Sequence, residues 1–194
     1  MNSSSKVLVV TNWTSLVLKD LERHGVIRHS TNQPELRQYN IVRELMSYYT
    51  TIKPAMWLTP EIIASLDVHT TEYLKFLKNC YASWEQDQDK HYLDYNSNGL
   101  VPTHFAKTQL TNNMLDKLPP YRLMGYYGED TMTPVHPQTY EVAMKSANNG
   151  YYAASEIDNY KVIYLSNTYP GHHASKNGYA GYCFLNNGAI CCNR

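Results

Sequence analysis

The sequence has no excess of either charge, no disulfide framework and no long apolar run. Lysine plus arginine and aspartate plus glutamate number 17 each, so we expect no direct nucleic-acid partner, because such binders need surplus positive charge. No apolar stretch approaches membrane-spanning length, which predicts a protein without a membrane partner. The four cysteines lack any C-x-x-C spacing. With no secretory signal at the start, they predict reduced thiols in the cytoplasm or nucleus, not a secreted protein.

Motifs of several common enzyme classes are also missing. The chain contains no G-x-x-x-x-G-K-[ST], no G-x-G-x-x-G and no G-x-S-x-G, so nucleotide-binding and serine hydrolase functions have no support from motifs. What the chain does have is 43% hydrophobic and 18% charged residues over a length of 194. That composition is typical of a folded domain with a buried core and excludes compositional disorder.

Two short β-branched segments, 6–11 and 161–166, predict buried strands. Helix-length amphipathic segments lie between them, and polar stretches at 85–98 and 99–120 predict loops. This order of elements is typical of α/β architecture with a parallel sheet. The predicted helices cover 35–49, a start at Thr59-Pro60, 70–84, 137–154 and a last start at 186.

The candidate functional segment is PGHHA at 170–174, directly after the second predicted strand. In α/β sheets, ligands bind beyond the carboxyl ends of the strands. Two adjacent imidazoles, His172 and His173, are costly in a core and useful where protons move near pH 7. Taken alone, the pair leaves two alternatives open, a catalytic dyad and a solvated loop with two incidental histidines.

In its context this loop resembles that of the zinc-dependent deacetylases, the histone deacetylases and acetylpolyamine amidohydrolases of the arginase/deacetylase superfamily. That loop reads P-G-H-H-A, a spacer, then G-[FY]-C-[FY]-x-N-[ND], and residues 170–187 read PGHHASKNGYAGYCFLNN. MGYYGEDTMTP at 124–134 is similar to the family's G-Y-Y-x-x-D-T-x-T-P, and DVHTTEYL at 67–74 to its vH-x-x-x-Y-l. Fainter echoes lie at 33–37 and 100–102. The matches follow the family order over most of the chain.

The resemblance implies a three-layer α/β fold, a parallel sheet with helices on both faces. It implies that residues 1–194 form the N-terminal part of one deacetylase-like domain, truncated at its C-terminus. We expect such a truncation to leave an unpaired sheet edge and exposed apolar surface.

The resemblance also assigns roles to five residues. His172 would act on the metal-bound water and stabilise the developing oxyanion, and His173 would serve as general base and then as acid to the leaving amine. Gly181 and Tyr182 would line the tunnel for the acylated amine. Asp130 lies where some histone deacetylases carry a rim aspartate that holds the substrate backbone.

Two departures from the family pattern stand out. Thr168-Tyr169-Pro170 replaces the usual Arg-Pro-Pro before the glycine, which leaves open what takes over from the arginine. The family's zinc ligands, an Asp-x-His pair and a more distant Asp, belong to segments beyond this chain, so we assign no metal ligand here. Asp67-Val68-His69 has the Asp-x-His letters but matches a segment that does not ligate metal.

Two functions from different classes follow. The first is a zinc-dependent amide hydrolase that removes acyl groups from lysine side chains of proteins or from polyamines. This chain would supply the histidine dyad and one tunnel wall, and a complementary C-terminal polypeptide would supply the metal site, so the chain alone is expected to be inactive. The second is a truncated, non-catalytic relic or binding module of the same fold.

Overall fold

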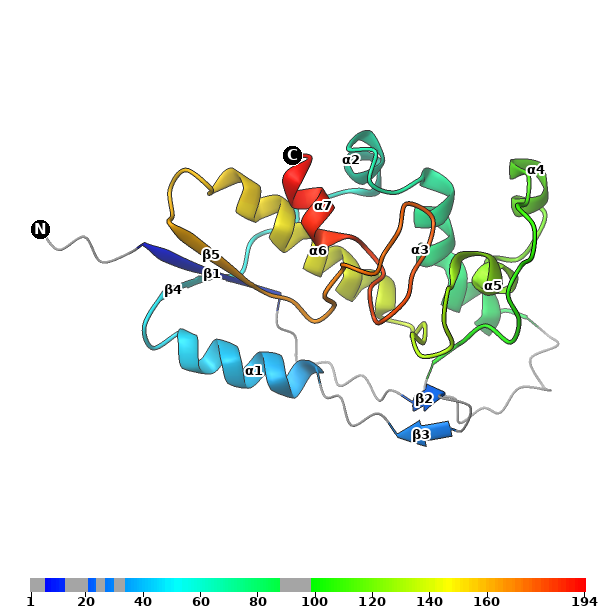
Figure 1. Ribbon diagram of the computed structural model, residues 1–194, viewed down its shortest axis with the longest axis horizontal. Coiled ribbons are helices and arrows are strands. Elements are labelled where there is room, and N and C mark those ends of the chain that lie inside the picture. Colours follow the sequence, from blue (N-terminus) through cyan, green and yellow to red (C-terminus); the bar gives the residue numbers. More distant parts are fainter. Residues whose placement is uncertain (1–5, 13–20, 24–26, 30–33, 88–98) are drawn as a thin grey trace, which may run out of the picture.

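The computed structural model describes residues 6–12, 21–23, 27–29, 34–87 and 99–194, and its main sheet is parallel. The order β4-β1-β5 places β1 (Val7–Thr11) between β4 (Thr50–Ile52) and β5 (Val162–Ser166) (Figure 1). Both strands expected from the sequence are therefore confirmed, and they are paired in parallel from end to end. A separate antiparallel pair consists of β2 (Leu21–Arg23) and β3 (Ile27–His29).

Helices cover both faces of this sheet (Figure 1). The helix α1 (Pro34–Leu45) packs on one face, and α6 (Thr139–Ser155), with α7 (Asn187–Cys192) beside it, packs on the other. The middle of β1 is fully enclosed because it has a strand on each side and a helix layer on each face. This arrangement confirms the expected three-layer α/β fold.

The remaining helices build a second half of the core next to the sheet. Thr59 and Thr70 cap the first two of them, each accepting a hydrogen bond from the backbone N–H three residues on. Such caps satisfy donors that a helix start leaves free, which is why Thr59-Pro60 predicted a helix correctly. In chain order they are α2 (Pro60–Ser65), α3 (Thr71–Glu85), α4 (Asn112–Leu115), the 3₁₀ turn η2 (Pro120–Leu123) and α5 (Met124–Tyr127).

Several boundaries differ from the expectations. The stretch 99–120 was predicted to be a loop, but it contains α4. The strand β4 was not predicted, because its three residues TTI are too short and too polar to show a strand pattern. The helix expected over 35–49 ends at Leu45. Residues 88–98 of the other predicted loop lie outside the described part.

The inner face of α1 combines an apolar residue, Val42, with a polar one, Gln38, while other apolar residues of this segment are exposed. Leu36, Tyr39 and Met46 are 52%, 37% and 61% exposed, whereas Gln38 is only 3% exposed. The Gln38 amide donates to the Ser166 carbonyl at 2.5 Å and accepts from the Thr168 hydroxyl at 2.9 Å. A polar side chain faces the sheet here because it satisfies groups at the carboxyl end of β5.

The strand β5 lies at one edge of the sheet that the described residues form. Within the described ranges its one strand neighbour is β1, and its apolar side chains Val162 and Tyr164 are 52% and 41% exposed. Within the described part, β5 is thus an edge strand with exposed apolar side chains, and the truncation that the resemblance implies stays a prediction. An edge of this kind is a template for a further strand.

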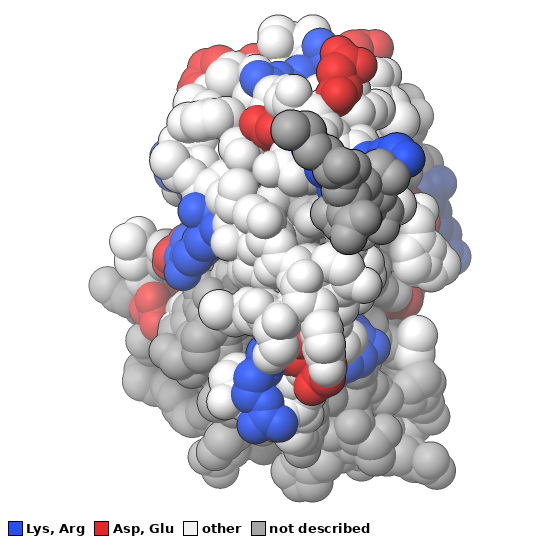
Figure 2. Space-filling view, turned by 90° about the vertical axis from the view of Figure 1, so that its left-hand side faces the viewer, with Lys and Arg blue, Asp and Glu red and all other residues white. Residues whose placement is uncertain are grey.

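Charge is dispersed on the surface. On the face that Figure 2 shows, basic and acidic groups lie scattered around an uncharged middle, without a block of one sign. Among the described residues, no helix combines the length and the apolarity needed to cross a membrane.

Replacing Gln38 with alanine should lower the free energy of unfolding by about 1–3 kcal/mol, because the Ser166 carbonyl and the Thr168 hydroxyl would lose a buried partner. Asn40→Ala, which removes an exposed amide on the same helix, should change it by less than about 0.5 kcal/mol. Urea titration measures both. Equal effects of the two substitutions would contradict the buried role of Gln38.

Candidate active site

The histidine pair lies on a loop that leaves the carboxyl end of β5 and returns to α7 (Figure 1). His172 and His173 are exposed, whereas Gly171 and Ala174 on either side of them are buried. The two imidazole rings lie next to each other, with centroids 4.3 Å apart and planes inclined at 46°. The loop therefore presents both rings to solvent from an anchored backbone.

A glycine and an asparagine fix the turn that precedes His172 and His173. Gly171 has φ +111°, a conformation open to glycine, and a Cβ there would lie 2.8 Å from the Asn187 nitrogen. The Asn187 side-chain amide donates to the carbonyls of Tyr169 and Pro170, both at 2.8 Å. The first turn of α7 thus holds the start of the loop in place.

Asp130 holds the returning arm of the loop, the part that leads back to α7. One carboxylate oxygen accepts from the backbone N–H groups of Met132 and Thr133, and the other accepts from the Thr133 hydroxyl and, at 2.7 Å, from the Gly181 N–H. The Thr133 hydroxyl oxygen in turn accepts from the Tyr182 N–H at 3.0 Å. Four hydrogen bonds engage the Asp130 carboxylate within the protein, and its role in holding substrate stays a prediction.

The structure brings Gly181 against His173. Gly181 and Tyr182 both have positive φ, +54° and +62°, so the chain makes a tight left-handed turn there. A Cβ on Gly181 would lie 2.5 Å from His173 Cδ2. The structure thus brings His172, His173 and Gly181 together, Tyr182 follows Gly181 in the same turn, and Asp130 accepts a hydrogen bond from the Gly181 N–H.

Beneath the loop lies a floor of stacked aromatic rings. Tyr179 and Phe184 from the loop stack at 5.4 Å between centroids, and Phe76 of α3 stacks on Tyr179 at 6.1 Å. The Tyr73 hydroxyl donates to the Phe184 carbonyl at 2.6 Å. Because burial raises the pKa of Tyr73 well above its usual value, that hydroxyl stays protonated and remains a donor.

His69 contacts the loop from the turn between α2 and α3. Its side chain is 1% exposed, its Nε2 accepts from the Asn186 N–H at 2.9 Å, and its Nδ1 lies 3.3 Å from the Lys176 carbonyl. Burial lowers the pKa of His69 to about 4, partly opposed by the hydrogen bonds to Lys176 and Ser175. The ring is therefore neutral at physiological pH.

At the base of the loop, Thr168 occupies the position where the family pattern has arginine. Its hydroxyl donates to the Gln38 side chain and is buried. The neutral hydrogen-bonded pair of Thr168, which follows β5, and Gln38 on α1 thus joins the base of the loop to the helix layer.

The described residues do not fit a zinc ion. Within these ranges, no three side chains of histidine, cysteine, aspartate or glutamate come together as a metal site, and zinc in proteins takes three or four such ligands. Asp67 pairs with Lys176 at 2.6 Å, and both ring nitrogens of His69 are used by the backbone. This part of the chain therefore does not form the metal centre that the family resemblance implies.

Sequence reasoning missed the residues that hold the loop. His69 lies in the segment that matched vH-x-x-x-Y-l, and the Asn186-Asn187 pair ends the longer loop motif, but neither match says what the side chains bind. The signal that could have found Asn186 is its position before a predicted helix, where asparagine is a preferred cap. The structure confirms that cap, since the Asn186 side chain accepts from the Ala189 N–H.

A comparison with known protein families matches residues 29–194 to the histone deacetylase domain. The chain belongs to the histone deacetylase family. This membership agrees with the resemblance read from the loop.

Among curated proteins, this deacetylase-family chain is similar to acetylpolyamine amidohydrolases. It is 28% identical over 124 residues to acetylpolyamine amidohydrolase 2 of Pseudomonas aeruginosa, covering 63% of this chain and 33% of that protein. It is 33% identical over 129 residues to acetylpolyamine amidohydrolase 1 of the same organism, covering 64% and 34%. The match thus spans about a third of each of these relatives' length.

A solved structure shares the fold. The crystal structure of acetylpolyamine aminohydrolase from Burkholderia pseudomallei superposes with a TM-score of 0.78 at 22% identity, over 95% of this chain and 51% of that one. The deacetylase-family chain therefore has the fold of about half of that solved structure.

Replacing Gly181 with alanine should displace the His173 ring, because the new methyl group would overlap its Cδ2 atom. It should also lower the free energy of unfolding by about 1–2 kcal/mol, because alanine is strained at positive φ. Gly188→Ala, at a position where a Cβ finds only an ordinary contact at 3.7 Å, is the matched control. Imidazole NMR signals of His173 and urea titration measure the two effects. An unmoved His173 signal in Gly181→Ala would contradict the contact.

The buried neutral His69 should make stability depend on pH. Because its pKa is about 4 in the folded protein and 6.5 ordinarily, the unfolded chain binds more protons between these values. The contribution of neutral His69 to the free energy of unfolding is fully present above pH 6.5 and decreases as the pH falls. At pH 4 it is smaller by about 3 kcal/mol. Unfolding of the wild type and of His69→Gln at pH 7 and pH 4 isolates it. A difference between the two proteins that does not change with pH would contradict this prediction.

Proposed function

We propose that this chain is part of an amide hydrolase that removes acetyl groups from amines. Acetylated polyamines are the favoured substrate class, because the relatives named above are acetylpolyamine amidohydrolases, and acetyl-lysine side chains of proteins are the other. The observation that carries the proposal is the pair of exposed imidazoles, 4.3 Å apart between ring centroids, on an anchored loop at the carboxyl ends of a parallel sheet. Histidines in that setting suit proton transfer near neutral pH.

In the proposed reaction, His173 accepts a proton from the water that attacks the acetyl carbon. As the carbon–nitrogen bond breaks, His173 passes that proton to the leaving nitrogen, so that amide and water become acetate and free amine. His172 donates a hydrogen bond to the carbonyl oxygen while negative charge develops on it. Gly181 and Tyr182 form one wall of the substrate tunnel, and Asp130 keeps that wall in place and contacts the substrate at its rim.

We propose that a further segment, of a longer chain or of a separate C-terminal polypeptide, supplies the zinc ligands. Two observations support this. Among the described residues, no side chain accepts a hydrogen bond from the His172 or His173 ring, whereas catalytic and metal-bound histidines are commonly oriented by carboxylates. Among the described residues β5 is an edge strand with exposed Val162 and Tyr164, so it offers a place where further strands would add. The four cysteines are free thiols, which supports a location inside the cell.

A non-catalytic binding module of the same fold is the second candidate. The observation that favours it is that the described residues form no metal site. Such a module would keep the loop, the tunnel wall and the aromatic floor, and it would bind an acetylated amine without cleaving it.

The test is acetate release from an acetylpolyamine and from an acetyl-lysine peptide, with zinc present. The chain is assayed alone and together with the polypeptide encoded downstream of it. We expect hydrolysis in the mixture only, faster with the acetylpolyamine, and His173→Ala should lower kcat by at least about 100-fold because a general base is lost. His104→Ala, which removes an exposed histidine outside the loop, should leave the rate unchanged.

Each outcome decides between the candidates. Absence of hydrolysis with either substrate in the zinc-loaded mixture would sink the enzymatic proposal, and retained binding of the acetylated amine would then favour the module. Activity of the chain alone would contradict the need for a completing segment.

A further inference from the structure

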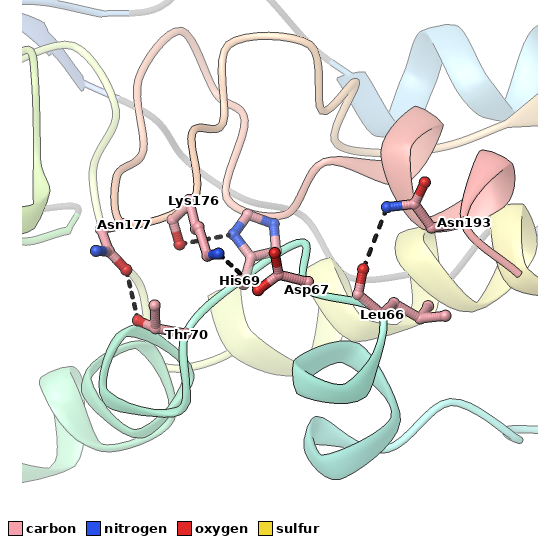
Figure 3. A network of polar contacts seen from close by, with 7 residues as sticks. All are labelled: Leu66, Asp67, His69, Thr70, Lys176, Asn177 and Asn193. Atoms are coloured by element: carbon pink, nitrogen blue, oxygen red, sulfur yellow. Dashed lines mark hydrogen bonds and ion pairs between the residues drawn. The ribbon is translucent and has the colours of Figure 1, made fainter.

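The loop that carries the histidine pair rests on the turn between α2 and α3. Figure 3 shows this contact region, in which residues 66–70 lie against the loop and the end of α7. The turn is tight, because Asp67 adopts φ +56°. The two segments are more than a hundred positions apart in the sequence, so the contact is purely tertiary.

Most contacts in this region are at the surface. The Lys176 ammonium pairs with Asp67 at 2.6 Å, and the Thr70 hydroxyl donates to the Asn177 side chain at 2.5 Å. The Asn193 amide donates to the Leu66 carbonyl at 3.2 Å. Exposed pairs of this kind contribute little to stability. The Thr70 N–H also donates to the Lys176 carbonyl at 3.3 Å, which ties the outgoing arm of the loop to the start of α3 but does not reach the returning arm.

His69 differs from its neighbours because it is buried and uses both ring nitrogens. Its Nε2 accepts from the Asn186 N–H at 2.9 Å, which places the ring proton on Nδ1, from which it is donated to the Lys176 carbonyl at 3.3 Å. Lys176 and Asn186 lie on the outgoing and returning arms of the loop. One imidazole therefore joins both arms.

The path from His69 to the pair is short. Asn186, which His69 holds by its backbone N–H, donates from its side chain to the Ala174 carbonyl at 3.0 Å. Ala174 is the residue next to His173. The position of Asn186 therefore sets the position of the backbone that follows the proposed general base.

We propose that His69 is a positioning residue of this site, whose ring joins the two arms of the loop and thereby sets the orientation of the His172–His173 pair. For its link to catalysis this inference rests on the proposed function. His69 does not touch the reacting atoms in this arrangement. It acts through Asn186 and Ala174 on His173, as groups behind an active site commonly do.

The first measurement uses the unaltered full chain. Nitrogen-15 NMR of labelled histidine reports which ring nitrogen carries the proton, and we expect His69 in the Nδ1–H form at pH 7, without titration near pH 6.5. A His69 ring protonated on Nε2, or one titrating like an exposed histidine, would overturn the proposal without any substitution.

The second measurement compares two substitutions in the full chain. Glutamine can accept from the Asn186 N–H and donate to the Lys176 carbonyl, whereas leucine fills similar space with neither capacity. We expect His69→Leu to shift the imidazole signals of His172 and His173 and to speed amide exchange at Asn186 at least about 10-fold, as loss of one buried hydrogen bond implies. His69→Gln should stay close to the wild type in both respects.

Activity of the completed enzyme separates this inference from the proposed function. We expect His69→Leu to lower kcat more than it raises KM and to move the pH profile, and His69→Gln to restore both. If the NMR effects occur but the wild type hydrolyses neither substrate, the proposed function fails and the positioning of the pair by His69 stands. If both variants leave the signals of the pair and the Asn186 exchange unchanged, the inference fails whatever the activity.

Discussion

The candidate site depends on side chains that satisfy the backbone of an irregular loop. Between β5 and α7 the chain has little regular secondary structure, so its buried N–H and carbonyl groups need partners from elsewhere. Asn187 bonds to the start of the loop, Asp130 bonds to Gly181 on the returning arm, and His69 bonds to both arms. An aromatic floor then fills the space below, which leaves the two imidazoles as the exposed part of a fixed structure.

The same loop lies beside a strand that exposes apolar side chains. The strand β5, from which the loop departs, has a partner strand on one side and exposed apolar side chains at its free edge within the described part. Solvated apolar side chains on a strand that belongs to a parallel sheet are unusual, because such sheets are normally covered on both faces. The fold matches about half of a solved relative, and the further segment that we propose would cover this surface and bring its own side chains near the loop.

Sequence patterns predicted the elements correctly where residues close together in the chain determine the structure. The β-branched segments gave β1 and β5, and the Thr59-Pro60 cap gave α2. They failed where packing decided the outcome. In the segment of α1 the structure buries Val42 but leaves Leu36 and Tyr39 exposed, and it buries Gln38, which donates to the Ser166 carbonyl at the carboxyl end of β5.

By itself the sequence determined the family and the candidate dyad, because the P-G-H-H-A loop and its companion segments are local patterns of residue types. It also determined the α/β class, since strand and helix periodicities are local as well. Only the tertiary structure decided what holds the dyad. His69 and Asn186 are 117 positions apart, and Asp130 and Gly181 are 51 apart. Hydrogen bonds over such separations form only when packing brings the partners together, so no spacing in the sequence encodes them.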